Sequence, residues 1–181
     1  MYARFIDEFT VIPAPEEYWG IRNFNKNPEI MKQYGFLPME SAPQKKHMRP
    51  HYELADGIIR KTYVEYAGDA LIDYRKKMIE RLQTVFKQYE QKYLNSSDIT
   101  MASTLAVMRK PKGTAVTVWL SNFWQRYFLE KTKIETAECA ADFSAVEFRA
   151  DMLGEPPHTM RELSEESAEL YAEIIKESNG V

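Results

Sequence analysis

The sequence predicts an α+β protein, with a small β-hairpin-rich N-terminal region followed by a mainly α-helical domain. Short β-prone runs fill residues 1–67, where prolines and the turn pair Asp56-Gly57 separate them. A stripe of apolar residues at helical spacing extends from Ile72 to Tyr93 and predicts one long amphipathic helix. We therefore expect two domains, a β-rich and loop-rich region at 1–67 and a helical domain at 68–181.

The N-terminal region contains two predicted hairpins and one short helix. Residues 2–6 and 9–12 are β-prone and flank an acidic pair, which predicts the first hairpin. Asn27-Pro28 predicts a helix start, because Asn is a good N-cap and Pro is tolerated at the first helical position. The second hairpin is predicted around the Asp-Gly pair at 56–57, which readily adopts the positive φ angles of a tight turn.

The long helix is predicted to begin near Asp69, which can cap it, and to end at Tyr93 or Leu94. Its apolar residues recur at alternating spacings of three and four, as on one face of a helix. The stripe consists of Ile72, Arg75, Ile79, Leu82, Phe86, Tyr89 and Tyr93, and Leu71, Met78 and Val85 widen it on one flank.

Caps and helix breakers predict the rest of the helical domain. A short helix follows Asn95, a turn occupies residues 110–113, and an aromatic helix covers 115–131. A less regular helix is expected at 134–141. Thr159 and Glu162 have the spacing of a capping box, which opens a last helix that Asn179-Gly180 ends.

The composition is that of an ordinary globular chain, with 44% hydrophobic and 28% charged residues among 181. The formal net charge of −3 gives no overall basic bias, so nucleic acid is not an expected partner. The single cysteine, Cys139, excludes an intrachain disulfide. No run reaches the ~20 apolar residues of a membrane helix, and the first residues lack the apolar core of a secretion signal, so no membrane association is expected.

No pattern of catalytic or ligand-binding residues is recognisable. His47 and His51 are four residues apart, but Pro50 argues against the helix that this ligand spacing needs. Acidic residues surround Cys139, which disfavours a reactive thiolate. The glycines are too far apart for a phosphate-binding loop. We therefore expect no enzymatic activity, no catalytic residue, no cofactor and no metal site.

The long stripe has two interpretations. It can pack against other helices of the same chain, or against a second chain, because a helix of this length exceeds what a small domain readily covers. Arg75 at a seam position argues against a continuous homomeric coiled coil. On the second interpretation, the partner interface consists of Ile72, Ile79, Leu82, Phe86, Tyr89 and Tyr93.

The aromatic helix also has two interpretations. Its rings recur at helical spacing, which is typical of a core-facing stripe. Aromatic rings can instead stack on nucleic acid bases, and Arg126, Lys131 and Lys133 lie nearby in the sequence. The residues concerned are Trp119, Phe123, Trp124, Tyr127 and Phe128.

Several segments of the chain occur in the same order as in a known group of proteins. They are the start Met1–Phe5, the short helix that ends at Tyr34–Pro38, a hairpin ahead of a long charged helix, and the Ser-containing segment Ser97–Ser103. An aromatic helix follows, with tryptophans spaced as Trp119 and Trp124 are. In this order of parts the chain resembles small tail-associated proteins of tailed bacteriophages and prophages, which are found beside tail-fibre or baseplate components.

The resemblance implies a non-enzymatic structural or adaptor protein of the tail or tail-fibre region of the virion, made in the bacterial host cytoplasm. Its partners would be other phage tail proteins or copies of itself, and the loop-rich region 1–67 would dock on them. A tail-fibre assembly chaperone, absent from the finished particle, is the nearest alternative. An unrelated intracellular enzyme and a nucleic-acid-binding module are the remaining two.

Overall fold

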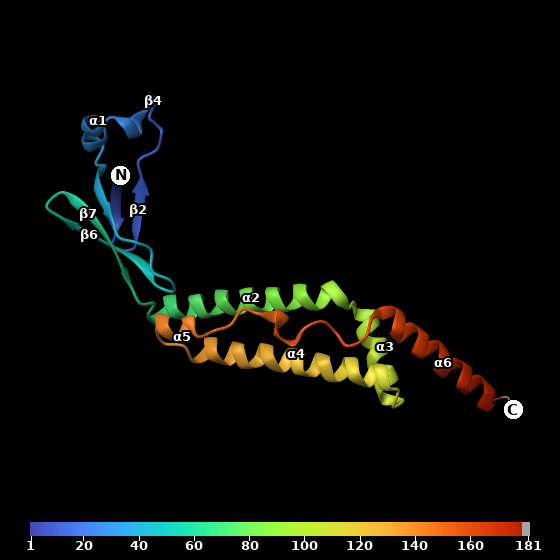
Figure 1. The fold of residues 1–181 in the computed structure, drawn as a ribbon. Coiled ribbons are helices and arrows are strands. Elements are labelled where there is room, and N and C mark those ends of the chain that lie inside the picture. Colours follow the sequence, from blue (N-terminus) through green and yellow to red (C-terminus); the bar gives the residue numbers. More distant parts are fainter. Residues whose placement is uncertain (179–181) are drawn as a thin grey trace. The chain divides into compact units, whose positions relative to one another are not determined.

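The computed structural model describes residues 1–178 and confirms the α+β fold class (Figure 1). The chain divides into two compact units. Unit 1 comprises Met1–Ile72 together with Glu138–Ser144, and unit 2 comprises Asp73–Ala137 together with the residues from Ala145 onward. The predicted division after residue 67 therefore differs in two respects: unit 1 extends to Ile72, and a short segment from the helical half belongs to it.

Unit 1 is built on a five-stranded sheet with the strand order β2-β1-β5-β7-β6. Neighbouring strands are antiparallel, except for the parallel pair β5 and β7. Strand β6 also approaches the β1–β2 turn, where the Tyr52 N–H donates to the Glu8 carbonyl at 2.7 Å. The sheet is therefore curled, with its last strand brought close to its first hairpin. The strands are β1 (Tyr2–Asp7), β2 (Thr10–Pro13), β5 (Leu37–Ser41), β6 (Arg49–Ala55) and β7 (Ile58–Val64).

Both predicted hairpins are confirmed, as β1–β2 and β6–β7. Asp56 and Gly57 have φ angles of 53° and 70°, so this pair makes the tight turn between β6 and β7. Strand β5 follows the short helix, in a segment for which no strand is predicted from the sequence. It forms because it pairs with residues 59–61 of β7, which are distant in the chain.

A small extension of unit 1 carries two short strands and two short helices. These are β3 (Glu17–Tyr18), β4 (Ile21–Arg22), the 3-10 helix η1 (Phe24–Lys26) and α1 (Pro28–Gln33). The predicted cap of α1 is confirmed, because the Asn27 side chain accepts from the Ile30 N–H at 3.3 Å. One core cluster, Phe24, Met31 and Phe36, lies under this extension, and a second cluster, Ala3, Met39 and Ile59, lies under the sheet.

Unit 2 is helical. The helices α2 and α4 lie side by side, and the segment after α5 runs along them towards α6 (Figure 1). The capping box predicted for α6 is confirmed, and Asn95 and Asp98 form a further capping box at the start of α3. The predicted stop of the last helix at Asn179-Gly180 lies outside the described residues. The elements from residue 68 onward are α2 (Gly68–Tyr93), α3 (Ser96–Val107), α4 (Pro111–Thr136), α5 (Ala140–Ser144, within unit 1), η2 (Ala150–Leu153) and α6 (Met160–Ser178).

The start of α4 corrects the prediction of a turn at residues 110–113. Pro111 occupies the first turn of the helix, where its missing N–H costs nothing. A Cβ atom on Gly113 would lie 2.3 Å from the Leu105 Cβ and 2.8 Å from the Ala102 carbonyl oxygen. This glycine therefore permits the close approach of α3 and α4. The separate helix predicted at 134–141 is also wrong, because α4 continues to Thr136.

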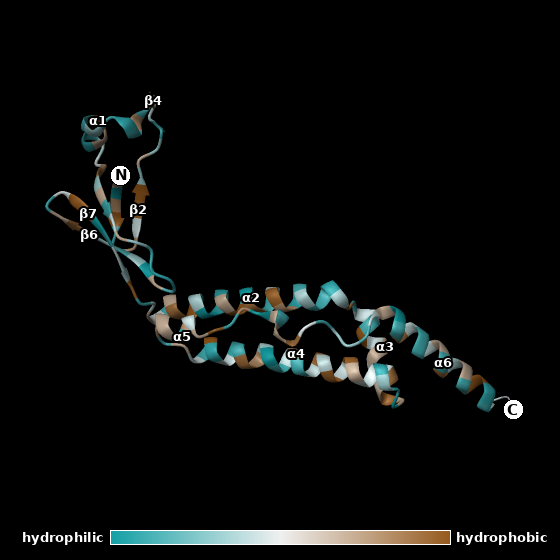
Figure 2. Ribbon diagram, in the orientation of Figure 1, coloured by the Kyte–Doolittle hydropathy of each residue, from teal (hydrophilic) through white to brown (hydrophobic). Residues whose placement is uncertain are grey.

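Figure 2 shows hydrophobic and hydrophilic residues alternating along each helix of unit 2. Within residues 1–178, none of the helices combines the length and the apolar character that crossing a lipid bilayer requires.

Candidate protein-interaction surfaces

The central part of the stripe on α2 faces the interior of unit 2. Leu82 and Phe86 are fully buried, and the Phe86 ring centroid lies 5.1 Å from that of Phe123 and 5.6 Å from that of Tyr127. Both α2 and α4 have 26 residues, so α4 is long enough to cover this face. The assignment of Leu82 and Phe86 to a partner interface is therefore corrected: these side chains belong to the chain's own core.

The remaining four stripe residues are more accessible. Ile79, Tyr89 and Tyr93 are half-buried, and Ile72 is 61% exposed. The Tyr89 ring stacks on Phe123 with 6.0 Å between centroids, and burial raises the pKa of its hydroxyl above the ordinary value. A partner contact at these four residues stays a prediction.

Arg75 interrupts the apolar stripe for a structural reason. Its Nε and Nη2 atoms donate to the Ala137 carbonyl at 3.0 and 2.7 Å. Ala137 is the C-cap of α4, where backbone carbonyls lack helical partners and the helix dipole favours a cation. Arg75 therefore caps the C-terminus of α4.

The aromatic helix contributes most of its rings to the core. Trp119, Phe123 and Tyr127 are buried, and the Trp119 and Phe123 rings stack with 5.1 Å between centroids. The core interpretation is confirmed for these three residues. Phe128 differs, because 57% of it is exposed, and Trp124 is half-buried.

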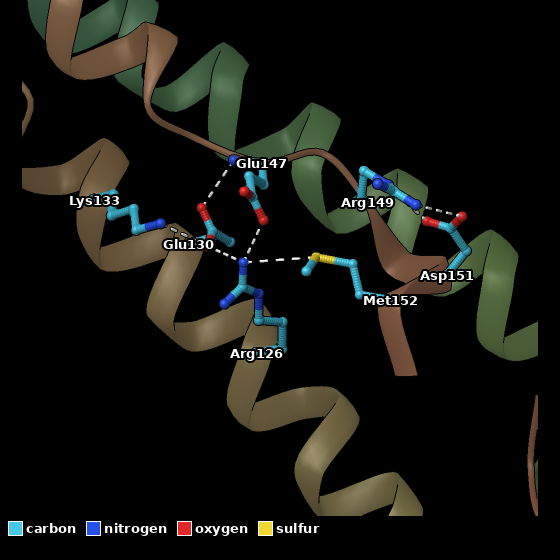
Figure 3. Close-up of polar contacts among 7 residues, drawn as sticks. All are labelled: Arg126, Glu130, Lys133, Glu147, Arg149, Asp151 and Met152. Atoms are coloured by element: carbon cyan, nitrogen blue, oxygen red, sulfur yellow. Dashed lines mark hydrogen bonds and ion pairs between the residues drawn. The ribbon is translucent and has the colours of Figure 1, made fainter. Parts of the chain in front are cut away.

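A buried carboxylate joins α4 to the segment that follows α5 (Figure 3). Glu130 is completely buried and pairs with Arg126 at 3.0 Å and with Lys133 at 2.8 Å. Its second oxygen accepts from the Glu147 N–H at 2.9 Å, and Arg126 also pairs with the Glu147 carboxylate. The cluster fixes the segment around Glu147 onto α4. Its ion pairs and hydrogen bond compensate the Glu130 carboxylate for the loss of water on burial.

A second buried carboxylate holds α6. The Glu166 oxygens accept from the Lys112 and Gly113 N–H groups at 3.0 and 2.9 Å, at the N-terminus of α4. The positive end of the α4 dipole favours this anion. Leu163 and Leu170 are buried on the same part of α6. The first half of α6 is therefore fixed firmly to unit 2.

The second half of α6 is not covered by other parts of residues 1–178. Tyr171, Ile174 and Ile175 are 67%, 45% and 55% exposed, and their spacing places them on one helix face. We call these three residues the α6 tip. Figure 1 shows this part of the helix extending beyond α3.

A groove of about 640 Å³ lies between the C-terminal part of α2, α3 and the middle of α4. Its apolar lining comes from Ile99, Leu120, Trp124 and Phe128, and we call it the α2–α4 groove. Glu90 provides a carboxylate at its side, whose Oε1 accepts from the Trp124 Nε1–H at 2.7 Å. The volume falls within the range of ~300–1,000 Å³ that is typical of binding pockets.

Unit 1 presents one large aromatic side chain to solvent. Trp19 is 83% exposed and lies at the turn between β3 and β4, where its φ angle is 51° and that of Gly20 is 79°. Positive φ is rare for a bulky residue. No sequence pattern singled out this tryptophan, because a two-residue strand carries too little periodicity.

The three histidines occupy separate environments. His51 lies 3.8 Å from both Glu8 and Glu53, the His47 ring stacks on Phe143, and His158 lies 3.6 Å from Glu162. Within residues 1–178, no group of three or more His, Cys, Asp or Glu side chains is placed to hold a metal ion.

No protein-family model, curated protein or solved structure matches this chain. Its function is therefore inferred from the surfaces described above.

Proposed function

We propose that this chain is a non-enzymatic structural or adaptor protein of a bacteriophage tail or tail-fibre region. It acts through contacts with other tail proteins or with copies of itself. The observation that carries the proposal is Trp19, a large apolar side chain held in solvent by a strained turn.

Three properties of Trp19 favour a role as an interface anchor. A left-handed backbone costs a bulky residue roughly 1–2 kcal/mol, and such strain is concentrated at functional positions. The preceding residue, Tyr18, fixes the hairpin to the core, because its ring centroid lies 4.9 Å from that of Phe24 and 5.4 Å from that of Phe36. Tryptophan is also enriched among the residues that contribute most to protein interfaces.

The tail assignment draws its support from the resemblance of this chain to small tail-associated phage proteins. Under that assignment, the protein is made in the host cytoplasm and incorporated into the virion. Residues 1–67 dock on the partner, and Trp19 in the β3–β4 turn is the most exposed large hydrophobic residue described in that region.

The test uses the full-length chain, tagged and expressed in infected or induced host cells. Trp19→Ala is expected to keep the wild-type melting temperature, since the side chain is exposed, and to lose its co-purifying tail protein. Leu54→Ala is the matched control, because Leu54 is an exposed hydrophobic residue elsewhere in unit 1. Equal recovery of the tail protein with wild type and Trp19→Ala contradicts the anchor. Recovery of no tail protein with the wild type contradicts the function.

The assembly chaperone is the second candidate, because it uses the same kind of surface. Mass spectrometry of purified particles separates the two. A structural protein is present in the particle in fixed proportion to other tail proteins. A chaperone binds the fibre protein in cell extracts and is missing from the particle.

A further inference from the structure

We draw no further inference here: the strongest candidate, the α2–α4 groove, is an open apolar surface, and nothing among residues 1–178 shows what covers it.

Discussion

The two units bury different kinds of residue. Unit 1 is held by two small apolar clusters, around Ile59 and around Phe24. The buried charged side chains found among the described residues, Asp98, Glu130 and Glu166, all lie in unit 2. Both units enclose a core, but only the helical one encloses carboxylates within it.

The difference follows from the way each unit provides hydrogen-bond partners for its backbone N–H groups. Strands pair their N–H groups with neighbouring strands, whereas the first turn of a helix leaves its N–H groups without partners. Two of the buried carboxylates of unit 2, Asp98 and Glu166, accept from backbone N–H groups at a helix start, whereas Glu130 accepts from the Glu147 N–H in a non-helical segment. Asp98 accepts from Asn95 at 2.7 Å, and Glu166 accepts from the start of α4. At the starts of α3 and α4, buried carboxylates therefore supply acceptors that the paired strands of unit 1 do not need.

The largest expected effect on stability comes from truncating one core side chain in each unit, in separate variants. Phe123→Ala should destabilise unit 2 by about 3–5 kcal/mol, and Ile59→Ala should destabilise unit 1 by about 2–5 kcal/mol, because both side chains are fully buried. Hydrogen exchange followed by mass spectrometry should show lost protection in α2 and α4 for the first variant and in β6 and β7 for the second. Equal loss across all elements in both variants would show that the units unfold together and that the comparison fails.

Glu130→Ala tests the contribution of a buried carboxylate. It leaves the Glu147 N–H and two cations without their acceptor, so a loss of about 1.5–3 kcal/mol in unfolding free energy is expected from urea denaturation. Glu135→Ala is the control: Glu135 pairs with Lys131 at 3.3 Å on the exposed side of α4, and such pairs contribute at most about 1 kcal/mol. An unchanged unfolding free energy in Glu130→Ala would mean that the cluster contributes nothing to the stability of unit 2.

Gly113→Ala tests the close packing of α3 on α4, and the sign of the change in stability decides the outcome. In an ordinary helix, replacing Gly by Ala stabilises by about 0.5–1 kcal/mol. Here the added Cβ meets Leu105 and the Ala102 carbonyl, so a destabilisation of about 1–3 kcal/mol is expected from a thermal melt. Thr114→Ala, at the exposed neighbouring position, should change the melting temperature little. An unchanged or raised melting temperature for Gly113→Ala would show that α3 and α4 can separate freely.

The smallest effect is a pH dependence at the start of α6. The Thr159 N–H donates to Glu162 at 2.7 Å and holds the pKa of that carboxyl below its ordinary value. The ionised form therefore stabilises α6 at pH values above the unfolded pKa, and this contribution is lost as pH falls through the lower folded pKa. Protection factors in the first turn of α6, which correct for the intrinsic pH dependence of amide exchange, should fall over that acidic range, and Glu162→Gln should flatten their profile. A wild-type profile that does not change with pH would contradict the capping box.

Local signals predicted much of the fold. The Asp56-Gly57 turn, the Asn27 cap and the Thr159 capping box each depend on residues a few positions apart, so the sequence displays them directly. Strand β5 was missed because its partner residues in β7 lie about twenty positions away. Gly113 was interpreted as a turn residue because sequence alone does not show that a second helix crosses at that point.

The candidate surfaces were harder to predict than the fold. The stripe on α2 was correctly recognised as amphipathic, but its partner could not be identified from periodicity, and Leu82 and Phe86 pack within the chain. Glu130 and Glu166 are two of 27 acidic residues, with no local pattern to distinguish them from solvated ones. Trp19 is conspicuous only through its backbone angle and exposure, and both are properties of the folded chain.

The membership of Glu138–Ser144 in unit 1 has a consequence for the order of events on the ribosome. Phe143 in this segment is buried, and Glu65 accepts from the Ala140 N–H at 2.8 Å. Domains generally fold from the N-terminus as the chain emerges during synthesis. Here the N-terminal unit lacks one of its own segments until residue 144 has been translated, after α2, α3 and α4 have already been made. Three helices of unit 2 are therefore synthesised before unit 1 can be completed, and unit 2 in turn is completed only when α6 has been made.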